Sequence, residues 1–246
     1  MTVQTTQVAV AAPPALHVQS RGVVILELFT SEGCSSCPPA DELLRSVNGT
    51  QTADGQLIVG ISEHVTYWNR LGWTDLYSDE AFTSRQASYA NRLSPEGAYT
   101  PQMVLNGREQ IVGSDGAALR QALQDEAHRR PVVLSVLHSA VEGDYLTVRF
   151  GLAGAPPDRT LDLIAVWTDD MDRSNVLRGE NSGRNLQHVS VARELIQVGS
   201  ARGDTEQTVR LAVPPRLRTD SGGHHLILFA QEQHQGAIVG ATTMPL

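Results

Sequence analysis

Residues 23–41 read VVILELFTSEGCSSCPPAD and carry the clearest structural signals in the chain. Its first part is β-branched and almost entirely apolar, which predicts a central strand covered on both faces. The two prolines after the second cysteine lack N–H groups, so they fit the first turn of a helix that we expect over residues 38 to about 47. Because a residue before proline avoids the α region, we expect Cys37 at the N-cap and Cys34 just outside the helix. Helix N–H groups and the helix dipole stabilise a thiolate at such a junction.

The next segments predict an α/β unit that ends near residue 130. Residues 57–61 form a second apolar run, which we expect to pair in parallel with the first strand through the intervening helix. Apolar side chains recur at helical spacing over residues 79–93 and 116–129. Between these helices, Asn106-Gly107 separates two short runs and predicts a hairpin whose turn needs positive φ at both central residues.

From residue 131 onward the pattern changes to short apolar runs separated by Gly, Pro and Asp turns, with no convincing helix. The predicted strands span residues 132–137, 145–152, 161–167, 189–198, 208–213 and 226–230. We therefore expect an α/β domain over residues 21–130 and an all-β, sandwich-like domain over residues 131–246. Residues 1–20 lack the positive start and apolar block of a secretory signal, and we expect a flexible tail or the remnant of a trimmed leader.

The charge balance excludes several classes of function. The chain has 27 acidic residues against 19 basic ones, a net charge of −8, so neither nucleic acid nor an anionic membrane surface is an expected partner. Every basic residue is an arginine, which excludes Schiff-base chemistry and a P-loop because both need lysine. No apolar stretch approaches the ~18 residues of a membrane span. The sequence leaves the oligomeric state open.

The C-x-x-C motif has three interpretations: a redox pair, half of a zinc site, or an incidental pair of surface thiols. A structural zinc site needs four protein ligands, and the chain has no second C-x-x-C and no H-x-x-x-H. Adding His64 would still leave the set one ligand short. We therefore favour a redox pair and expect neither a metal nor an organic cofactor. Ser35 and Ser36 can donate hydrogen bonds to a Cys34 thiolate, whereas the charge of Asp41 opposes it.

The order of the predicted elements resembles the thioredoxin fold. That order is strand, C-x-x-C helix, strand, long connection, Thr-Pro, hairpin and helix. In the thioredoxin fold a cis proline after the long connection lies against the dithiol and orients the incoming chain, and Pro101 matches that position. The resemblance implies that the Thr100–Pro101 peptide bond is cis. The alternative is an ordinary trans proline that enters a strand.

Four strings extend the resemblance over nearly the whole chain. They are LFTSEGCSSCPPAD at residues 28–41, HVTYWNRLGW at 64–73, YTPQMVLNG at 99–107 and RGENSGRNLQH at 178–188. They resemble those of a bacterial family of secreted or periplasmic-type thioredoxin-like proteins of unknown function. The resemblance implies a thioredoxin-like N-terminal domain, four candidate patches and a periplasmic or secreted location. A chain without a signal peptide is otherwise expected in the cytoplasm.

Together these features predict a thiol–disulfide oxidoreductase that acts on protein or low-molecular-weight thiol substrates. We expect Cys34 to be the more exposed, attacking sulfur and Cys37 to resolve the mixed disulfide. The residues expected to contact the substrate are Thr100, Pro101, Gln102, His64 and Trp68. For the last three, a purely structural role is the alternative. Two other functions stay open: a non-catalytic module in which the dithiol and His64 bind Cu(I) or zinc, and a protein-interaction scaffold with an inert disulfide.

Two further features have competing interpretations. Glu27 interrupts the apolar strand, so it is either a buried carboxylate that relays protons to Cys37 or an exposed residue at a sheet edge. Residues 178–185 form a polar loop, which either folds back over the first domain with arginines that hold an anion or remains solvated. We favour the solvated loop.

Overall fold

The computed structural model describes residues 22–129, 132–219 and 222–246. The tail expected over residues 1–20 lies outside these residues. The described strands are β1 (Val23–Thr30), β2 (Leu57–His64), β3 (Gln102–Leu105), β4 (Glu109–Val112), β5 (Val133–Glu142), β6 (Tyr145–Ala153), β7 (Leu161–Asn175), β8 (Asn185–Ala201), β9 (Thr205–Ala212), β10 (His224–Glu232) and β11 (Ile238–Pro245). The described helices are α1 (Pro38–Val47), the short 3-10 helix η1 (Asn69–Leu71), α2 (Glu80–Leu93), α3 (Gly116–Glu126) and α4 (Pro215–Thr219).

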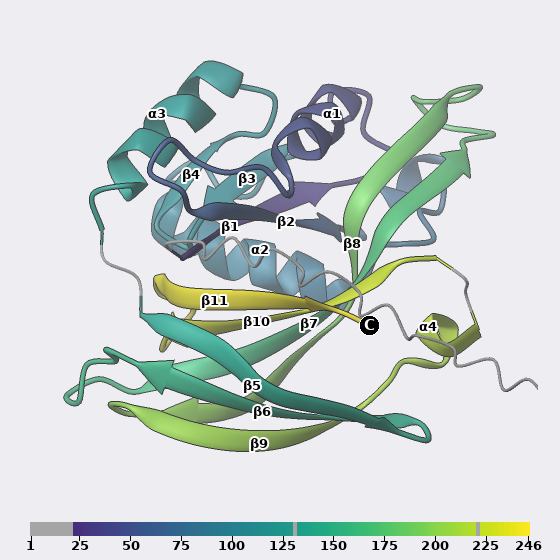
Figure 1. Ribbon diagram of the computed structural model, residues 1–246. Coiled ribbons are helices and arrows are strands. Elements are labelled where there is room, and N and C mark those ends of the chain that lie inside the picture. The colour runs from purple at the N-terminus through teal and green to yellow at the C-terminus, as the bar shows by residue number, and fades with distance from the viewer. Residues whose placement is uncertain (1–21, 130–131, 220–221) are drawn as a thin grey trace, which may run out of the picture.

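Two sheets organise the molecule (Figure 1). One is mixed and eight-stranded, in the order β11-β10-β7-β8-β2-β1-β3-β4, and the other is three-stranded, in the order β5-β6-β9. β1 pairs in parallel with β2, from Val23 opposite Leu57 to Thr30 opposite His64, as the predicted β–α–β unit requires. All eight residues of β1 are buried, which confirms the prediction of a central strand.

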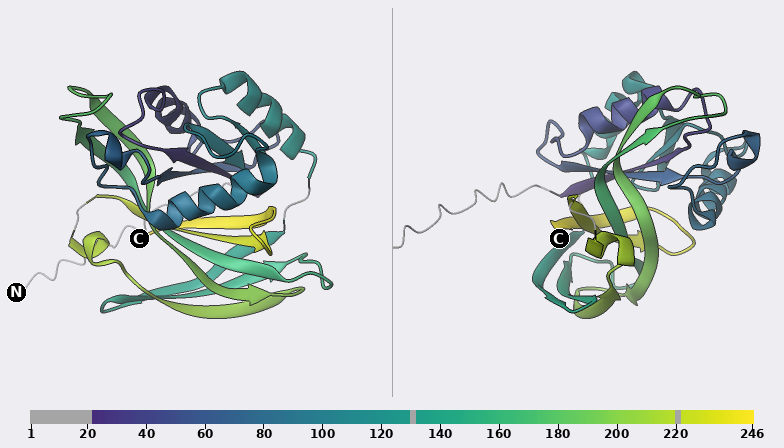
Figure 2. Two further views of the ribbon diagram at one scale, coloured as in Figure 1. Left: turned by 180° about the vertical axis from the view of Figure 1, so that it is seen from behind. Right: turned by 90° about the vertical axis from the view of Figure 1, so that its right-hand side faces the viewer.

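The two faces of β1 pack against different helices, because side chains alternate along a strand. Leu26 lies in a core with Leu44 of α1 and Leu119 of α3. Ile25 points the other way and packs with Phe82 of α2. Figures 1 and 2 show α1 and α3 on one side of this part of the sheet and α2 on the other. The helix that follows the cysteines therefore lies on the face of the sheet opposite α2.

The predicted boundary near residue 131 does not divide the large sheet. β8 pairs in parallel with β2 at Val191 and Ser62, so strands from both sides of the boundary form one sheet. The outer face of β7 and β10 packs on β5, β6 and β9 around a core that contains Trp167 and Phe150. The apolar runs predicted these strands, but such runs do not specify which strands pair. The second half also contains β11 and the five-residue helix α4, which the sequence did not predict.

Local sequence signals predicted the elements of the first half closely. α1 spans the expected residues, α2 begins one position later than predicted, and α3 ends at Glu126 rather than at 129. The hairpin between β3 and β4 has positive φ at both predicted positions, 45° at Asn106 and 60° at Gly107. The Thr100–Pro101 peptide bond is cis, as the resemblance implied.

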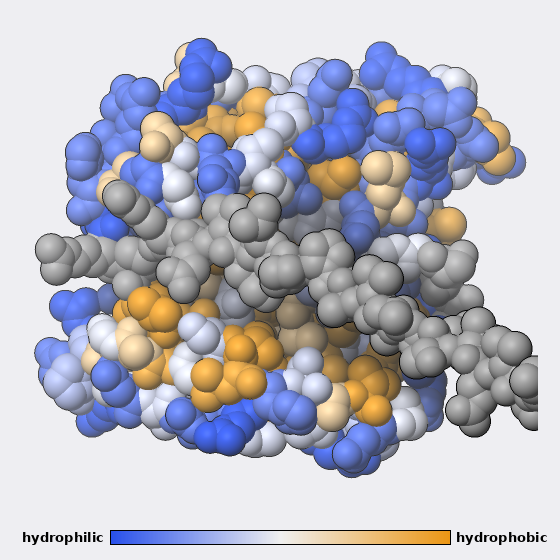
Figure 3. Space-filling model, viewed as in Figure 1, coloured by the Kyte–Doolittle hydropathy of each residue, from blue (hydrophilic) through white to orange (hydrophobic). Residues whose placement is uncertain are grey.

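The surface seen in Figure 3 is largely hydrophilic over the helices of the first half. Hydrophobic side chains gather over β5, where Val133, Leu137 and Val141 are exposed. No described helix is long and apolar enough to cross a membrane, since the longest, α2, has 14 residues. The edge strand β5 thus leaves several apolar side chains in solvent.

Candidate functional site

Cys34 and Cys37 form a disulfide at the N-terminal end of α1, with their Cα atoms 5.4 Å apart. Cys37 is the N-cap residue and Pro38 opens the helix, whereas Cys34 lies in the preceding turn, as predicted. The reason given for that placement is wrong, because Cys37 has helical angles of φ −78° and ψ −36° although it precedes a proline. The N–H of Cys37 donates to the carbonyl of Cys34 (3.2 Å) and closes the turn.

Both sulfurs are shielded from solvent in the disulfide form. Cys34 and Cys37 each have 0% of their surface exposed, so the expectation that Cys34 is the more exposed cysteine is wrong. Ser35 and Ser36 are exposed between them, and Ser36 Oγ lies 3.3 Å from Cys34 Sγ. A hydroxyl at that distance can donate a hydrogen bond to a Cys34 thiolate once the disulfide is reduced.

Trp68 and Thr100 lie together beside the C-x-x-C turn. Trp68 Nε1 donates a hydrogen bond to Thr100 Oγ1 (2.8 Å). A β-carbon placed on Gly33 would lie 3.1 Å from Trp68 Cβ, so the missing side chain of Gly33 lets the tryptophan approach the residue before Cys34. These two predicted residues are therefore neighbours of the disulfide, and Trp68 is half-buried.

Pro101 lies against the first turn of α1. A β-carbon placed on Gly113 would lie 3.0 Å from Pro101 Cβ and 3.1 Å from Ala40 Cβ, so one glycine separates the proline from the helix. The N–H of Gly113 also donates to the carbonyl of Pro101 (2.9 Å). The structure thus brings a third predicted residue to the cysteine-bearing end of the helix.

Gln102 and His64 lie away from solvent, because each has 0% of its surface exposed. Gln102 Oε1 accepts from Gln86 Nε2 (3.1 Å), and Gln102 Nε2 donates to Gln110 Oε1 (3.3 Å). His64 Nδ1 lies 2.7 Å from Asp75 Oδ2. These bonds are internal to the protein, so the structure does not place either side chain where a substrate would touch it.

A group of buried charged side chains lies next to the C-x-x-C turn. We call it the acid–histidine cluster, and it consists of Glu32, Asp41, His64, Asp75 and His188. His188, from β8, lies between two carboxylates: its Nε2 is 3.6 Å from Glu32 Oε1 and its Nδ1 is 3.7 Å from Asp41 Oδ1. The rings of His188 and His64 meet edge to face, with centroids 4.6 Å apart.

The carboxylates of Glu32 and Asp41 are attached to opposite ends of the turn. Glu32 precedes Cys34 by two residues, and its Oε2 accepts a hydrogen bond from Trp73 Nε1 (2.7 Å). The N–H of Asp41 donates to the carbonyl of Cys37 (3.1 Å) in the first turn of α1. Two negative charges therefore flank the two sulfurs along the chain.

The charges of the cluster favour a protonated His188. Burial lowers the pKa of His188, but the carboxylates of Asp41 and Glu32 outweigh burial and raise that pKa to about 10. Burial raises the pKa of Asp75, and the interaction with His64 outweighs it, so the pKa of Asp75 falls to about 2. At neutral pH the cluster therefore holds an imidazolium between Glu32 and Asp41.

Residues 176–184, which we call the covering loop, connect β7 to β8 and close over the cysteines. Figures 1 and 2 show this hairpin beside α1. Asn181 is fully buried, and its Nδ2 donates to the carbonyl oxygens of Glu32 (2.9 Å) and Cys34 (2.8 Å). The segment therefore folds back over the first half of the chain through Asn181, although residues 177–180 and 182–184 are exposed to solvent, as the favoured interpretation expected.

The covering loop makes two further contacts with the first half of the chain. The N–H of Ser35 donates to Glu180 Oε2 (3.1 Å). A β-carbon placed on Gly179 would lie 3.3 Å from Trp73 Cβ, so the loop backbone lies close to the tryptophan that binds Glu32. The two arginines of the loop are exposed. The loop thus acts through its glutamate and asparagine rather than through the predicted arginines.

Sequence reasoning did not identify Asn181, His188 or Asp75 as site residues. Asn181 and His188 belong to the string at residues 178–188, so the family resemblance was the signal that pointed to their region. Asp75 lies two positions beyond the string at 64–73. No local pattern marks any of the three, because their importance comes from contacts distant in sequence.

Glu27 is buried but does not serve Cys37. Its carboxylate accepts hydrogen bonds from Arg85 Nε and from Tyr89 OH (2.6 Å), both from α2. Alternation along β1 directs Glu27 to the α2 face, opposite α1. The expected burial of this carboxylate is confirmed and the exposed edge position is wrong. Burial, together with the charge of Glu27, raises the pKa of the neighbouring Glu63 well above its usual value.

The described residues contain no group of three or more His, Cys, Asp and Glu side chains arranged to hold a metal ion. The ring nitrogens of His64 face Asp75 (2.7 Å) and Ser62 Oγ (3.3 Å). The structure therefore does not assemble the metal site considered from the dithiol and His64.

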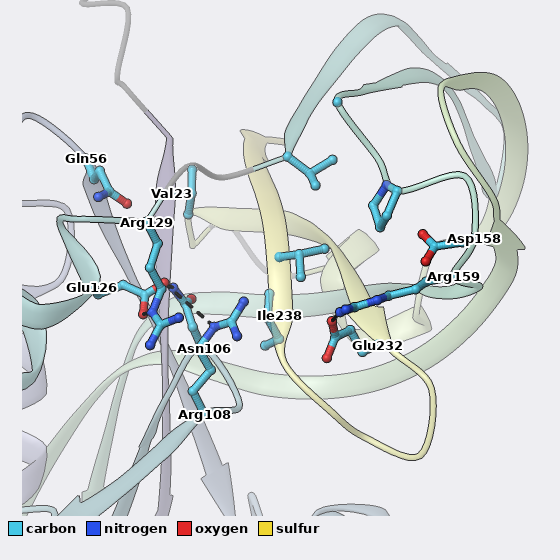
Figure 4. A pocket seen from close by; sticks show the side chains of 14 residues that line it. Val23, Gln56, Asn106, Arg108, Glu126, Arg129, Asp158, Arg159, Glu232 and Ile238 are labelled. Atoms are coloured by element: carbon cyan, nitrogen blue, oxygen red, sulfur yellow. Dashed lines mark hydrogen bonds and ion pairs between the residues drawn. The ribbon is translucent and has the colours of Figure 1, made fainter.

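A cavity of about 350 Å³ lies at the opposite end of β1 (Figure 4). Val23, the first residue of β1, lines it, and the eight residues of the strand span roughly 23 Å before the chain reaches the cysteine turn. The charged side chains around the cavity form ion pairs, Arg129 with Glu126 (3.1 Å) and Arg159 with Glu232 (2.8 Å). This cavity is therefore separate from the C-x-x-C site.

Comparison with known proteins gives a family and a structural neighbour. A family profile described as "Protein of unknown function (DUF1223)" matches residues 25–231. A protein of Agrobacterium tumefaciens with a known crystal structure is 31% identical, and the match covers 92% of this chain and 94% of that one with a TM-score of 0.68. A DUF3823 family protein from Bacteroides ovatus is 11% identical over 46% of this chain and 52% of its own, with a TM-score of 0.31, which is too weak to bear on function. No curated protein matched the chain.

Proposed function

This chain belongs to the family described as protein of unknown function (DUF1223), and we propose that its activity is thiol–disulfide exchange at Cys34 and Cys37. The observation that carries the proposal is the disulfide between these two cysteines at the N-terminal end of α1. The helix dipole at such an end stabilises the thiolate that exchange requires. Pro101 and Trp68 beside the turn support a substrate-binding surface there.

The reaction transfers two electrons and needs only a thiol partner. A substrate thiolate attacks one sulfur of the Cys34–Cys37 disulfide, a mixed disulfide forms, and the other cysteine leaves as a thiolate that takes up a proton. A second substrate thiol then releases the first as a disulfide, so the protein gains two electrons and two protons while two thiols become one disulfide. The reverse sequence oxidises the protein dithiol. Cys34 is the proposed site of attack, and Cys37 is the proposed resolving cysteine.

We also propose that the first half of the chain is thioredoxin-like. In support, β1, α1 and β2 form a parallel β–α–β unit with the cysteines at the carboxyl end of β1. β3 and β4 form an antiparallel hairpin beside β1, and α3 follows on the same face as α1. This is the order of elements expected from the sequence. The sheet continues through β8 into the second half, which goes beyond that expectation.

A polypeptide is the proposed substrate in preference to a small thiol. Leu71 of η1, Leu76 and Leu177 are 52%, 77% and 72% exposed, and they belong to the two segments that contact the cysteine turn through Trp68 and Asn181. The two segments approach each other, because a β-carbon placed on Gly179 would lie 3.6 Å from the carbonyl oxygen of Leu71. Apolar side chains grouped at a surface favour contact with another apolar chain over contact with water. An exposed apolar rim suits a peptide segment better than a charged small thiol.

One alternative is favoured by a specific observation. The complete burial of both sulfurs suits an inert disulfide in a protein-binding scaffold. Exchange needs a thiolate to reach a sulfur atom, so the covering loop or the turn at Ser35 must move before the proposed reaction begins. The two functions differ in whether the buried disulfide equilibrates with thiols while the protein stays folded.

Equilibration with thiol redox buffers tests the proposal. The folded protein is incubated in glutathione and dithiothreitol buffers poised between about −100 and −350 mV, and the fraction of reduced Cys34 and Cys37 is measured after alkylation. We expect one reversible two-electron transition with an unchanged circular dichroism spectrum. A disulfide that is reduced only when the protein unfolds would refute the proposal and favour the scaffold. If the folded protein does equilibrate, Cys37→Ser should trap a disulfide-linked partner on Cys34. Cys34→Ser serves as the control, because it removes the attacking sulfur.

A further inference from the structure

We propose that His188, from the second half of the chain, supplies the positive charge that sets the acidity of the Cys34–Cys37 dithiol. The inference rests on the proposed function and names the residue that tunes it. His188 is a positioning residue rather than a catalytic one, because it acts through Glu32 and Asp41. Its role makes the strand β8 part of the redox site.

The geometry places His188 between two carboxylates whose residues border the cysteine turn. Its two ring nitrogens lie 3.6 Å from Glu32 Oε1 and 3.7 Å from Asp41 Oδ1. Glu32 is two residues before Cys34, and the N–H of Asp41 is bonded to the carbonyl of Cys37. One imidazole therefore bridges the two carboxylates at the two ends of the cysteine turn.

The charges around the turn explain why a cation is needed. Two buried carboxylates next to a dithiol oppose the thiolate that forms on reduction, and burial strengthens this repulsion because the local dielectric constant is low. An imidazolium between Glu32 and Asp41 offsets one of their two charges and favours the thiolate of Cys34. Without His188, the two carboxylates would keep only neutral donors, Trp73 Nε1 on Glu32 and Thr30 Oγ1 on Asp41, among the described residues.

The other groups that face His188 do not replace it as a cation. The charged and titratable side chains around it are Glu32, Asp41, His64 from β2, Tyr77 from the segment before α2, and Asp172 opposite it on β7. Three of these five are acids. Asp172 is ion-paired with Arg193, and His64 is held by Asp75. The raised pKa of His188, about 10, keeps it charged through the neutral range.

His188 and Glu32 face each other at ion-pair distance without a hydrogen bond. Both ring nitrogens of His188, together with Glu32 Oε1, are buried without a hydrogen-bond partner among the described residues. At separations of 3.6 and 3.7 Å, the His188 imidazolium provides a positive charge to Glu32 and Asp41 without a direct hydrogen bond that would fix the geometry of the turn.

Two substitutions with opposite effects test the inference. In the chemically reduced protein, the pKa of the more acidic thiol is measured from the ultraviolet absorbance of the thiolate as a function of pH. We expect His188→Gln to raise that pKa by about one unit, because a nearby cation is lost, and Glu32→Gln to lower it by a similar amount, because an anion is lost. His224→Gln is the matched control, since it removes another buried histidine that lies beside a carboxylate, Asp169. It should leave the thiol pKa unchanged.

The redox equilibrium gives a second readout. At a pH where the acidic thiol of the reduced protein is ionised, raising the pKa of that thiol by one unit shifts the thiol–disulfide equilibrium with glutathione about tenfold toward the protein disulfide. This shift corresponds to a reduction potential that is lower by about 30 mV. His188→Gln should therefore be the more reducing protein and Glu32→Gln the more oxidising one. A purely structural role for His188 would lower stability in both variants and would not move the two potentials in opposite directions.

The outcomes separate this inference from the proposed function. The role of His188 is overturned if a folded His188→Gln protein keeps the thiol pKa of the parent protein. It is also overturned if the thiol pKa moves in the same direction in both variants. If His188→Gln does not fold, an unchanged thiol pKa in Glu32→Gln overturns it. A parent protein that never equilibrates with glutathione overturns the proposed function, while the thiol pKa values of the reduced proteins still decide the role of His188.

Discussion

Asn181→Ala is predicted to speed reduction of the buried disulfide. Asn181 Nδ2 donates to the carbonyl oxygens of Glu32 and Cys34, and these bonds hold the covering loop on the cysteine turn. The Cys34 carbonyl keeps the N–H of Cys37 as a second partner (3.2 Å), so the main loss is at Glu32. Removing the partner of one buried acceptor costs about 2 kcal/mol, the middle of the usual range.

That free energy affects the rate of disulfide reduction, because both cysteines have 0% exposure in the closed form and a reductant must wait for the loop to open. If reduction proceeds through a minor open state, destabilising the closed state by about 2 kcal/mol raises the open population about 30-fold. The rate of reduction by dithiothreitol should rise by the same factor at reductant concentrations where the rate is proportional to concentration. Circular dichroism and denaturant unfolding establish that the variant remains folded.

The assay follows the free thiols of Cys34 and Cys37 by alkylation and mass spectrometry over time. Ser182→Ala is the matched control, because its hydroxyl bonds the Leu177 carbonyl within the covering loop rather than the cysteine turn. The control should reduce at the parent rate. A folded Asn181→Ala protein that also reduces at the parent rate would refute the conclusion that this loop limits access to the disulfide.

Three further predictions concern stability. Cys37→Ser should lower the free energy of unfolding by about 2 kcal/mol, since the disulfide closes a loop of only about four residues; a much larger loss in urea unfolding would contradict this estimate. The pKa of Asp75 is about 2 in the folded protein against 3.8 ordinarily, so its contribution to the free energy of unfolding is complete above pH 4 and is lost as pH falls toward 2. In pH-dependent urea unfolding, Asp75→Asn should therefore reduce the loss of stability at acid pH by about 2 kcal/mol. An unchanged loss of stability at acid pH would contradict the assignment. Gly113→Ala should lower the free energy of unfolding by about 1–3 kcal/mol and slow thiol–disulfide exchange, because the new β-carbon would lie 3.0 Å from Pro101 Cβ and 3.1 Å from Ala40 Cβ. A variant with the thermal stability of the parent protein would contradict this prediction, since it would show that these neighbours adjust freely.

Local chemistry made part of the site predictable. Pro38 and Pro39 marked the start of α1 because a residue without an N–H group fits the first turn of a helix. Asn106-Gly107 marked the hairpin because few residue pairs tolerate positive φ at successive positions. Such signals act within a few residues, so each was readable without knowing the rest of the fold.

The burial of Cys34 and the partner of Glu27 could not be predicted from the sequence, for one reason. Burial depends on what packs over a residue, and the partners here are distant in sequence. Asn181 covers the cysteine turn from a position 147 residues beyond Cys34, and Arg85 meets Glu27 from 58 residues away. Hydrophobic periodicity reports which face of an element is apolar but does not identify the element that covers it.

The strand, the turn with its two cysteines and the helix that follows them could be predicted from local residue patterns alone. These features depend on backbone angles, missing N–H groups and side-chain volume, which are properties of neighbouring residues. Tertiary structure decided that the sulfurs are buried, that β8 joins the sheet beside β2, and that His188 lies between Glu32 and Asp41. Charges act through space rather than along the chain, so the electrostatic environment of the dithiol exists only once the two halves of the molecule have packed together.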